Sequence, residues 1–389
     1  MTSTSSRSTA LALIAFATFT DIVAYSVAVP VLPDLSRRLG ASPTTIGLLF
    51  ASFGVTLLLL SIPMGAFSDR TGRKAPLVGG LIALAVATVM FAFNAGLPLL
   101  FAARLVQGAA DAVTWVVGFA LIADLYGPHE RGRVTGIVMA GASFGFMIGP
   151  SLGGWLYEMG GIKLPFVTVA IMSLVAAAAI AWLDIPGVQA QQEPVPIGAV
   201  LSVPEVRSCA AAVVAASATI SMLEPVLALY LATLGVGPAR IGLLFGVAAV
   251  ATTTLHPLFG RLSDRLGARR LTIAGLFAGA LLLPLMGRAW SFESALPLYV
   301  VQAAGVALVI TPSLAYMGEA TSNAGIGSFG VAYGLYNMAW GVGLLGGPAL
   351  GGFLFERLGF ARLTLVWAPA LLLVTLALTR VQSIHTEES

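Results

Sequence analysis

Long apolar runs alternate with short polar segments along the whole chain. The runs cover residues 9–33, 44–68, 74–94, 97–126, 134–157 and 164–184, then 207–233, 238–260, 271–290, 294–318, 326–355 and 361–381. Each has the roughly 20 apolar residues that a helix needs to cross the hydrocarbon core of a membrane. Because backbone polar groups in lipid must be bonded within the segment, the runs are expected to be helices. The pattern predicts an all-α membrane protein with twelve transmembrane helices.

The polar segment after the second run returns after the eighth. Gly65 to Lys74 reads GAFSDRTGRK, and Gly260 to Arg270 reads GRLSDRLGARR. An offset of 195 residues places Asp69 on Asp264, and the same offset places Pro30 on Pro225 without a gap between. A repeat of this length indicates a duplicated half. We therefore predict two pseudo-symmetric six-helix bundles at residues 1–184 and 207–389, joined by a cytoplasmic linker at 185–206 that is rich in glutamine and proline.

Composition supports a lipid environment. Of the 389 residues, 58% are hydrophobic and 10% are charged, and the mean hydropathy is +0.95, whereas a soluble domain has about 25% charged residues. The single cysteine, Cys209, excludes an internal disulfide. The three histidines show no metal-site or catalytic-triad spacing, so we expect neither a metal, a cofactor nor an enzyme activity. The net charge of +3 gives no reason to expect a nucleic-acid partner.

The basic residues orient the helices. With the N-terminus in the cytoplasm, the cytoplasmic segments hold twelve lysines and arginines and the outer segments hold seven. This bias favours a multi-pass protein with both termini inside the cell.

Two acidic residues inside predicted helices are the main functional candidates. Asp21 is in the first and Glu224 is in the seventh. An ionisable residue inside a membrane is a functional hypothesis by default. Burial favours the neutral form of a carboxylic acid, so either acid is a plausible proton carrier, and its charged form would attract a cationic amine. The repeat aligns Glu224 with Val29, about two turns nearer the outer face than Asp21. The alternative is a pair of hydrogen-bonded structural acids without a role in transport.

The fourth helix carries four polar or aromatic residues on one face, namely Arg104, Gln107, Asp111 and Trp115. A buried arginine needs a partner, so this face is expected to point into the protein. Arg104 and Asp111 are two turns apart and are candidates for proton coupling, with a purely structural ion-pair network as the alternative.

Glycines recur at every fourth position in the fifth helix, at Gly141, Gly145, Gly149 and Gly153, followed in the eleventh by Gly343, Gly347 and Gly351. Such stripes let another backbone approach closely. Pro150 and Pro348 are expected to bend these two helices.

Aromatic residues form a second set of binding candidates. The eleventh helix has a cluster on one face, and further tyrosines lie in other helices. The set comprises Tyr25, Tyr230, Tyr316, Tyr333, Tyr336, Asn337 and Trp340. Aromatic faces bind organic cations and flat apolar rings. An interfacial aromatic belt is the alternative.

Together these motifs resemble the major facilitator superfamily, in its drug/proton antiporter branch, with a likeness to vesicular monoamine transporters and bacterial multidrug efflux proteins. The repeated loop resembles the signature loop, Arg104 to Gly108 the second motif, and Gly141 to Gly154 the antiporter motif of helix five. Two stretches resemble the vesicular monoamine transporters in particular, namely Met222 to Pro225 and Asp21 with the later Val29 to Pro33.

The resemblance implies that the loop after helix two is a conformational latch, in which Arg70 pairs with Asp124 and Asp69 accepts a bond from a neighbouring helix. Its other members are Gly65, Gly72 and Arg73, with a weaker second copy at Asp264 and Arg265. A simple positive-inside anchor is the alternative. The resemblance also implies that the glycine stripe of helix five lies where the two halves open and close, and that Arg104 takes part in proton coupling.

We therefore expect proton-coupled export of amphipathic organic cations or drugs by alternating access, in a plasma (inner) membrane. The expected partners are a small-molecule substrate, protons and the lipid bilayer, and the protein is expected to be a monomer. Two alternatives are a proton symporter that imports a small neutral metabolite and a non-transporting membrane sensor or assembly protein.

Overall fold

The computed structural model describes residues 4–93, 96–183, 202–323 and 329–386. In this part of the chain every regular element is a helix. The N-terminal half has α1 (Thr4–Ser26), η1 (Val29–Val31), α2 (Leu32–Leu39), α3 (Pro43–Thr71), α4 (Lys74–Phe93), α5 (Leu97–Leu125), α6 (Pro128–Gly160) and α7 (Lys163–Trp182). The C-terminal half has α9 (Pro204–Thr233), α10 (Pro238–Leu266), α11 (Ala268–Met286), α12 (Phe292–Asn323), α13 (Phe329–Leu358) and α14 (Phe360–Thr386). Most of the predicted linker lies outside the described residues.

Twelve of these helical segments are long and apolar enough to cross a membrane. The prediction of an all-α membrane protein with twelve transmembrane helices is confirmed. The fifth and eleventh spans continue through their internal prolines, since α6 contains Pro150 and α13 contains Pro348.

The first span differs from the prediction at its end. The helical path does not stop near Pro33 but passes through the short 3-10 turn η1 and continues as α2 to Leu39. Pro30 lacks a backbone N–H and so interrupts the α-helical ladder, and Pro33 occupies the first turn of the new helix, where no N–H is needed. Residues expected to form an outer loop are therefore partly helical.

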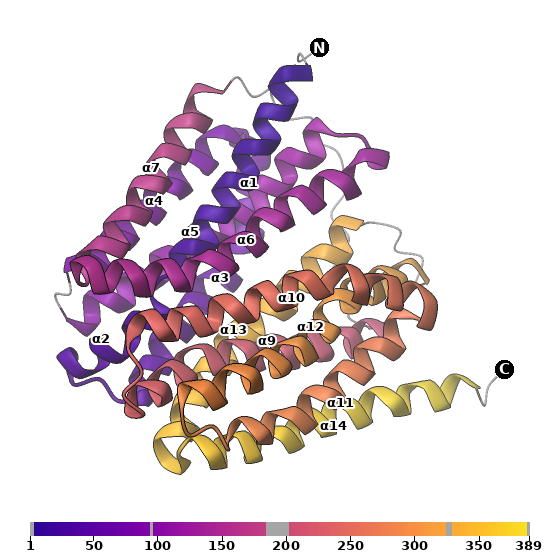
Figure 1. Cartoon of the computed structure of the whole chain (residues 1–389). Helices are drawn as coiled ribbons and strands as arrows, with labels where there is room; N and C mark the ends of the chain where they lie inside the picture. The colour runs from indigo at the N-terminus through magenta and orange to yellow at the C-terminus, as the bar shows by residue number, and fades with distance from the viewer. Residues whose placement is uncertain (1–3, 94–95, 184–201, 324–328, 387–389) are drawn as a thin grey trace. The chain divides into compact units, whose positions relative to one another are not determined.

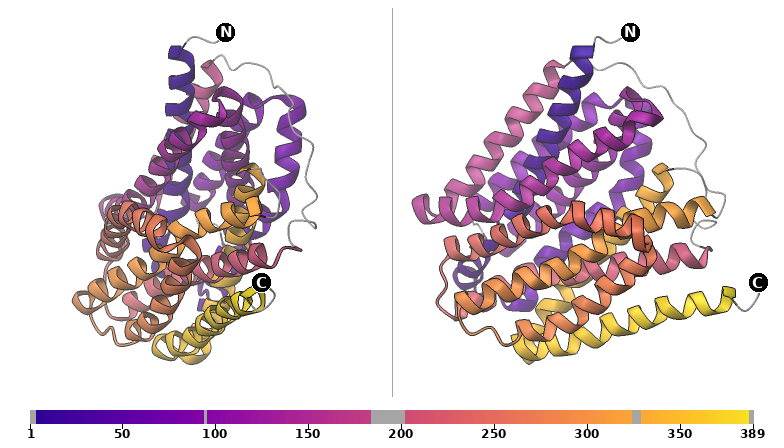
Figure 2. Two further views of the ribbon diagram at one scale, coloured as in Figure 1. Left: turned by 90° about the vertical axis from the view of Figure 1, so that its right-hand side faces the viewer. Right: turned by 45° about the vertical axis from the view of Figure 1, so that its right-hand side comes forward.

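The chain forms two compact units. Unit 1 comprises Met1–Ala41, Ser52–Gln191 and Gly237–Gly246, and unit 2 comprises Ser42–Ala51, Gln192–Val236 and Val247–Ser389. In unit 1, α1 packs on α6 and α4 packs between α5 and α7 (Figure 1). In unit 2, α9 packs on α13, and α11 packs on α12 and α14; α11 and α14 lie side by side in Figure 2. The two packing patterns correspond, as the internal repeat predicts.

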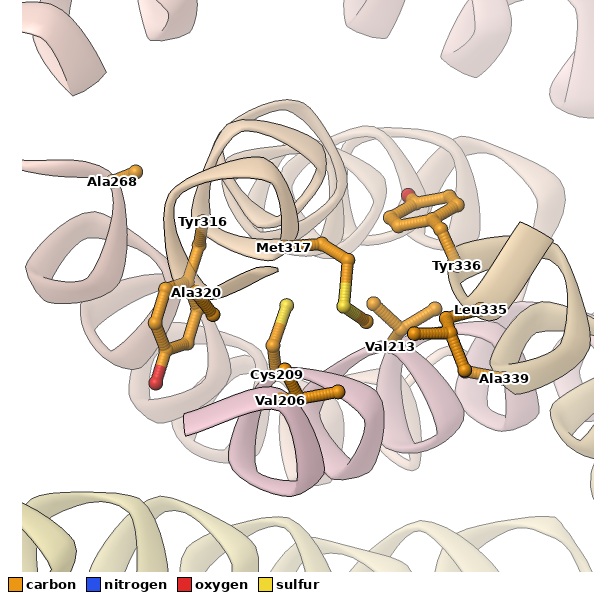
Figure 3. Packing of buried hydrophobic residues seen from close by; sticks show 10 residues of the cluster. All are labelled: Val206, Cys209, Val213, Ala268, Tyr316, Met317, Ala320, Leu335, Tyr336 and Ala339. Atoms are coloured by element: carbon orange, nitrogen blue, oxygen red, sulfur yellow. The ribbon is translucent and has the colours of Figure 1, made fainter. Parts of the chain in front are cut away.

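Unit 2 has a core beneath α9 in which aromatic, aliphatic and sulfur-containing side chains interdigitate (Figure 3). Cys209 and Met317 are completely buried there. Tyr316 and Tyr336 lie on opposite sides of Met317, and both are largely buried. This core fixes α9 against α12 and α13, and with them the position of Glu224 on α9.

The glycine stripes seat one helix of each unit on its neighbour. A Cβ atom added at Gly145 would lie 2.9 Å from the Cβ of Ile22 on α1, and one at Gly153 would lie 3.0 Å from the Cα of Val27. In unit 2, a Cβ at Gly347 would lie 2.8 Å from the Cα of Ala218 on α9. Gly141 and Gly149 also face α1, and Gly343 and Gly351 also face α9.

This arrangement corrects one expectation drawn from the resemblance. The stripe from Gly141 to Gly153 packs within unit 1 rather than between the two halves. The physical reason is the helical repeat: residues four apart stay on one side of α6, and that side is covered by α1 along its length.

Candidate functional site

Asp21 is the centre of a buried polar cluster in unit 1. Its side chain is 2% exposed. The indole Nε1–H of Trp115 on α5 donates a hydrogen bond to Asp21 Oδ2 at 3.1 Å. The side chains of Asp21 and Asp111, also on α5, are hydrogen-bonded to each other. Two carboxylates have no proton to share, so one member of this pair must be a carboxylic acid. Trp115 interacts with both acids, and its bond to Asp21 has good geometry. We take Asp21 as the charged member and Asp111 as the donor, an assignment that substituting each acid in turn tests.

Arg104 lies on α5, two turns before Asp111, and its side chain is fully buried. Its Nη1 donates to Gln107 Oε1 at 3.1 Å. The guanidinium lies over two rings, at 5.4 Å from the centroid of Tyr25 on α1 and 5.2 Å from that of Phe91 on α4. Aromatic faces stabilise a desolvated cation in this geometry. The structure thus buries Arg104, Gln107 and Asp111, as their shared face predicts, and leaves Trp115 partly buried.

Aromatic rings flank the acid pair. Tyr25 packs against Phe53 of α3 with ring centroids 5.1 Å apart. Trp115 stacks on Phe119 at 5.7 Å. The Asp21 carboxylate is therefore bonded directly to an aromatic side chain, and an acid beside an aromatic ring is the chemistry that binds an organic cation.

Glu224 is the acid of unit 2. It is 8% exposed and acts electrostatically on the hydroxyl of Tyr299, which lies on α12. Tyr299 was not predicted from the sequence.

The second overlooked group is His256 on α10, whose Nδ1 lies 2.6 Å from Thr311 Oγ1 on α12. His256 had been considered only for metal or triad spacing. Its position inside an apolar run could have identified it, because an ionisable residue within a membrane span is a functional candidate.

The other aromatic candidates have different surroundings. Tyr230 donates its hydroxyl to the carbonyl oxygen of Ala289 at 2.5 Å and stacks on Phe360 at 4.3 Å, so it ties the end of α9 to the start of α14. Tyr336 donates to the carbonyl oxygen of Ile310 at 3.4 Å and stacks on Trp340 at 6.4 Å. Tyr316 belongs to the core of unit 2, and Asn337 is half-buried. The side chain of Tyr333 lies outside the described residues.

The loop after α3 does form a network of ion pairs, but with a different arginine. Arg73 Nε donates to Asp124 Oδ2 at 2.8 Å, and Arg73 Nη1 donates to Asp69 Oδ1 at 2.5 Å. Arg70, predicted to be the partner of Asp124, is exposed in the last turn of α3. The reason is Gly72, whose φ of +88° ends the helix and folds the next side chain back under it. Gly65, about two turns before Gly72, lies close to Val116 of α5.

Burial alone would lower the pKa of the Arg73 guanidinium, but the carboxylates of Asp124 and Asp69 outweigh burial and raise it. Arg73 therefore stays charged at every physiological pH. It is 7% exposed, whereas Asp69 is 56% exposed. The pair with Asp124 is the more buried of the two bridges, and it ties the loop after α3 to α5.

The second copy of the loop lacks this network. Gly267 has a φ of +91°, matching Gly72. The residue that follows is Ala268, however, where the first copy has Arg73. Among the described residues no ion pair involves Asp264 or Arg265. The side chain at the position after the glycine explains the difference.

We expect Arg73→Ala to destabilise the folded protein by about 2 kcal/mol, because it leaves the partly buried Asp124 carboxylate without its charged donor. Arg70→Ala, the matched control on the exposed face, should change stability by less than about 0.5 kcal/mol. Thermal unfolding of the purified variants measures both. Equal effects of the two substitutions would mean that the loop is only a basic anchor at the membrane surface.

Comparison with known proteins agrees with this architecture. A family model for the Major Facilitator Superfamily matches residues 14–205 and 209–388. A probable vesicular acetylcholine transporter-B of Danio rerio is 30% identical over an alignment of 396 positions, which covers 94% of this chain and 78% of that protein. The human vesicular acetylcholine transporter is 32% identical, covering 85% of this chain and 65% of its own length. The human chromaffin granule amine transporter is 27% identical, covering 83% and 62%. The chain thus spans slightly less than two thirds of these two human relatives.

Solved structures show the same fold. A bacterial homologue of the human lysosomal transporter Spinster superimposes with a TM-score of 0.83 at 16% identity, over 98% of both chains. The human organic anion transporter MFSD10 superimposes with a TM-score of 0.72 at 16% identity, over 96% of this chain and 99% of that one. Twelve membrane-crossing helices, a duplicated half and a family match over both halves lead to one conclusion: the chain belongs to the major facilitator superfamily and is a membrane transporter.

Proposed function

We propose that this transporter exports amphipathic organic cations or drugs in exchange for protons, by alternating access. The observation that carries the proposal is the buried Asp21 carboxyl, hydrogen-bonded to Asp111 and Trp115 within membrane-spanning helices. An acid in this position is a functional hypothesis by default, because an uncompensated charge inside a membrane is costly.

The proposed coupling is a competition at one site. With both acids protonated the pair is neutral, which suits a dry environment. When a cation binds, one proton leaves the pair for water and the Asp21 carboxylate balances the positive charge of the cation. Asp111 keeps its proton and continues to donate to Asp21. One cation is then exchanged for one proton, and the charge within the site stays zero in both states.

The aromatic side chains beside Asp21 support a cationic substrate. The indole of Trp115 is hydrogen-bonded to Asp21 and stacks on Phe119, and aromatic faces attract quaternary ammonium groups. The names of the relatives point the same way: they are transporters of acetylcholine, which is a quaternary ammonium ion, and of amines.

Other parts of the proposal rest on the sequence pattern. Glu224 would be a second cation station in unit 2, and the network around Arg73 would bias one conformation. The two bundles would be residues 1–184 and 207–389, in a monomer in the plasma membrane with both termini in the cytoplasm. These assignments go beyond membership of the superfamily, and each can be tested on its own.

The test uses purified protein in liposomes with an acidic interior. We expect acetylcholine or ethidium to accumulate inside while an internal pH-sensitive dye reports proton exit. Liposomes without protein are the control. Proton movement in the same direction as the solute would identify a symporter. No flux of either cation, with correctly folded protein, would favour a sensor or assembly role.

A further inference from the structure

Two helices of this chain begin in one unit and continue in the other. Residues Ser42–Ala51 at the start of α3 belong to unit 2, whereas the rest of α3 belongs to unit 1. Residues Gly237–Gly246 at the start of α10 belong to unit 1, whereas the rest of α10 belongs to unit 2. We call these two stretches the exchanged segments. The internal repeat relates them, because Thr44 and Ala239 are 195 residues apart.

A glutamate holds the first exchanged segment inside unit 2. The backbone N–H of Thr44 donates to Glu356 Oε2 of α13 at 2.9 Å. The hydroxyls of Ser42 and Thr44 are hydrogen-bonded to the same carboxylate. The first N–H groups of a helix have no partner within the helix, and α3 begins with Pro43, which has none to offer. Glu356 therefore supplies an acceptor that α3 itself lacks.

A second glutamate does the same in unit 1. The backbone N–H of Ala239 donates to Glu158 Oε1 of α6 at 3.0 Å. Helix α10 also begins with a proline, Pro238. Glu158 lies two residues before the end of α6, and Glu356 lies two residues before the end of α13. The same bond thus occurs twice, between corresponding helices of the two repeats.

Close backbone contacts surround both glutamates. A Cβ atom at Gly47 would clash with the carbonyl oxygen of Pro348, and one at Gly242 would clash with that of Pro150. These glycines let each exchanged segment lie directly on the proline-containing stretch of α13 or α6. A side chain also joins one of these surfaces, since the Ser151 hydroxyl of α6 donates to the carbonyl oxygen of Gly242 at 3.2 Å. The glutamate bond adds a directional contact at the start of each exchanged segment.

We propose that Glu158 and Glu356 are positioning residues of the transport cycle, each a releasable cap that keeps an exchanged segment in its unit. Both carboxylates are exposed, so water can replace the backbone N–H when the cap opens. A helix cap of this kind changes an equilibrium by about fivefold. This is enough to bias two conformations without locking one. The proposal concerns conformation and does not depend on which substrate is carried.

The two caps are unequal. Glu356 binds two hydroxyls in addition to the backbone N–H, and the positions equivalent to Ser42 and Thr44 in the second repeat are Gly237 and Ala239, which have no hydroxyl. The structure therefore assigns the stronger cap to Glu356. Removing the Glu356 carboxylate should therefore free its exchanged segment more than removing the Glu158 carboxylate frees the other.

The test follows the accessibility of each exchanged segment. Ile46 and Ile241 are equivalent in the repeat and are 0% and 1% exposed. Each is replaced singly by cysteine in a Cys209→Ser background, and labelling by N-ethylmaleimide is timed on the purified full-length protein. We expect Glu356→Ala to speed labelling at Ile46→Cys by about fivefold or more, with Glu356→Gln intermediate because it keeps an acceptor without the charge. Glu158→Ala should speed labelling at Ile241→Cys by less.

Each substitution should affect only the reporter in its own unit, with the melting temperature nearly unchanged. Glu319→Gln, an exposed glutamate of α12, is the control. Unchanged labelling in Glu356→Ala would overturn the proposal. So would equal acceleration at both reporters or a lowered melting temperature without faster labelling, because either result describes a purely structural contact. Labelling needs no substrate, so a failure here is distinct from a failure of cation/proton exchange.

Discussion

Replacing Asp21 with asparagine should weaken binding of acetylcholine or tetraphenylphosphonium by about 30-fold or more, because the amide cannot balance a buried positive charge. In the wild-type protein the proton competes with the cation. The apparent Kd should therefore fall by up to about tenfold for each unit of rising pH, and level off once Asp21 is ionised. In Asp21→Asn this dependence should be nearly flat. Isothermal titration of the purified variants across pH measures both effects.

Asp111→Asn is the matched variant. An asparagine at this position still donates an N–H to Asp21, which also keeps its bond from Trp115. Cation binding should survive and should keep its dependence on pH, because Asp21 still carries the charge that balances the cation. If instead Asp111→Asn abolishes binding while Asp21→Asn retains it, the charge and the proton have been assigned to the wrong members of the pair.

The second large effect is expected from Gly149→Leu. A Cβ atom at Gly149 would clash with the Ser26 hydroxyl of α1 and lie 3.3 Å from the Cα of Val23. A leucine would separate α1 from α6 and displace Asp21, which is on the same helix. Forcing side-chain atoms between packed backbones typically costs 1–3 kcal/mol or more. We expect the melting temperature to drop by roughly 5 °C.

Gly79→Leu is the control for that experiment, because Gly79 is exposed on α4 with no atom near the added Cβ. It should leave the melting temperature within about 1 °C of the wild type. A Gly149→Leu protein of normal stability, but with cysteine accessibility from one side only, would show that the stripe lies at a moving interface after all.

The sequence was most informative where a physical rule acts on single residues. Hydropathy predicted the twelve spans because lipid requires a continuous apolar helix. The shared face of Arg104, Gln107, Asp111 and Trp115 predicted a buried polar side of α5, which the structure confirms. Proximity between helices was harder to foresee. Nothing in the spacing of Asp21 and Asp111 says that they share a hydrogen bond, since they lie on different helices.

The failures also have physical reasons. The resemblance paired Arg70 with Asp124, but it did not include the turn at Gly72, which brings Arg73 to that carboxylate instead. Periodicity located the glycine stripe but could not say which neighbour covers it. Glu158 and Glu356 were not among the candidate residues, because a helix start that belongs to the other unit has no signature in the sequence.

The most direct test of the account is proton release upon binding of a permanently charged cation. Acetylcholine and tetraphenylphosphonium have no proton to lose, so any proton that appears must come from the protein. Purified transporter in weakly buffered solution at mildly acidic pH, with a pH indicator, should release about one proton per bound cation, and Asp21→Asn should release almost none. Binding of the same cations without proton release from the wild-type protein would contradict exchange at Asp21.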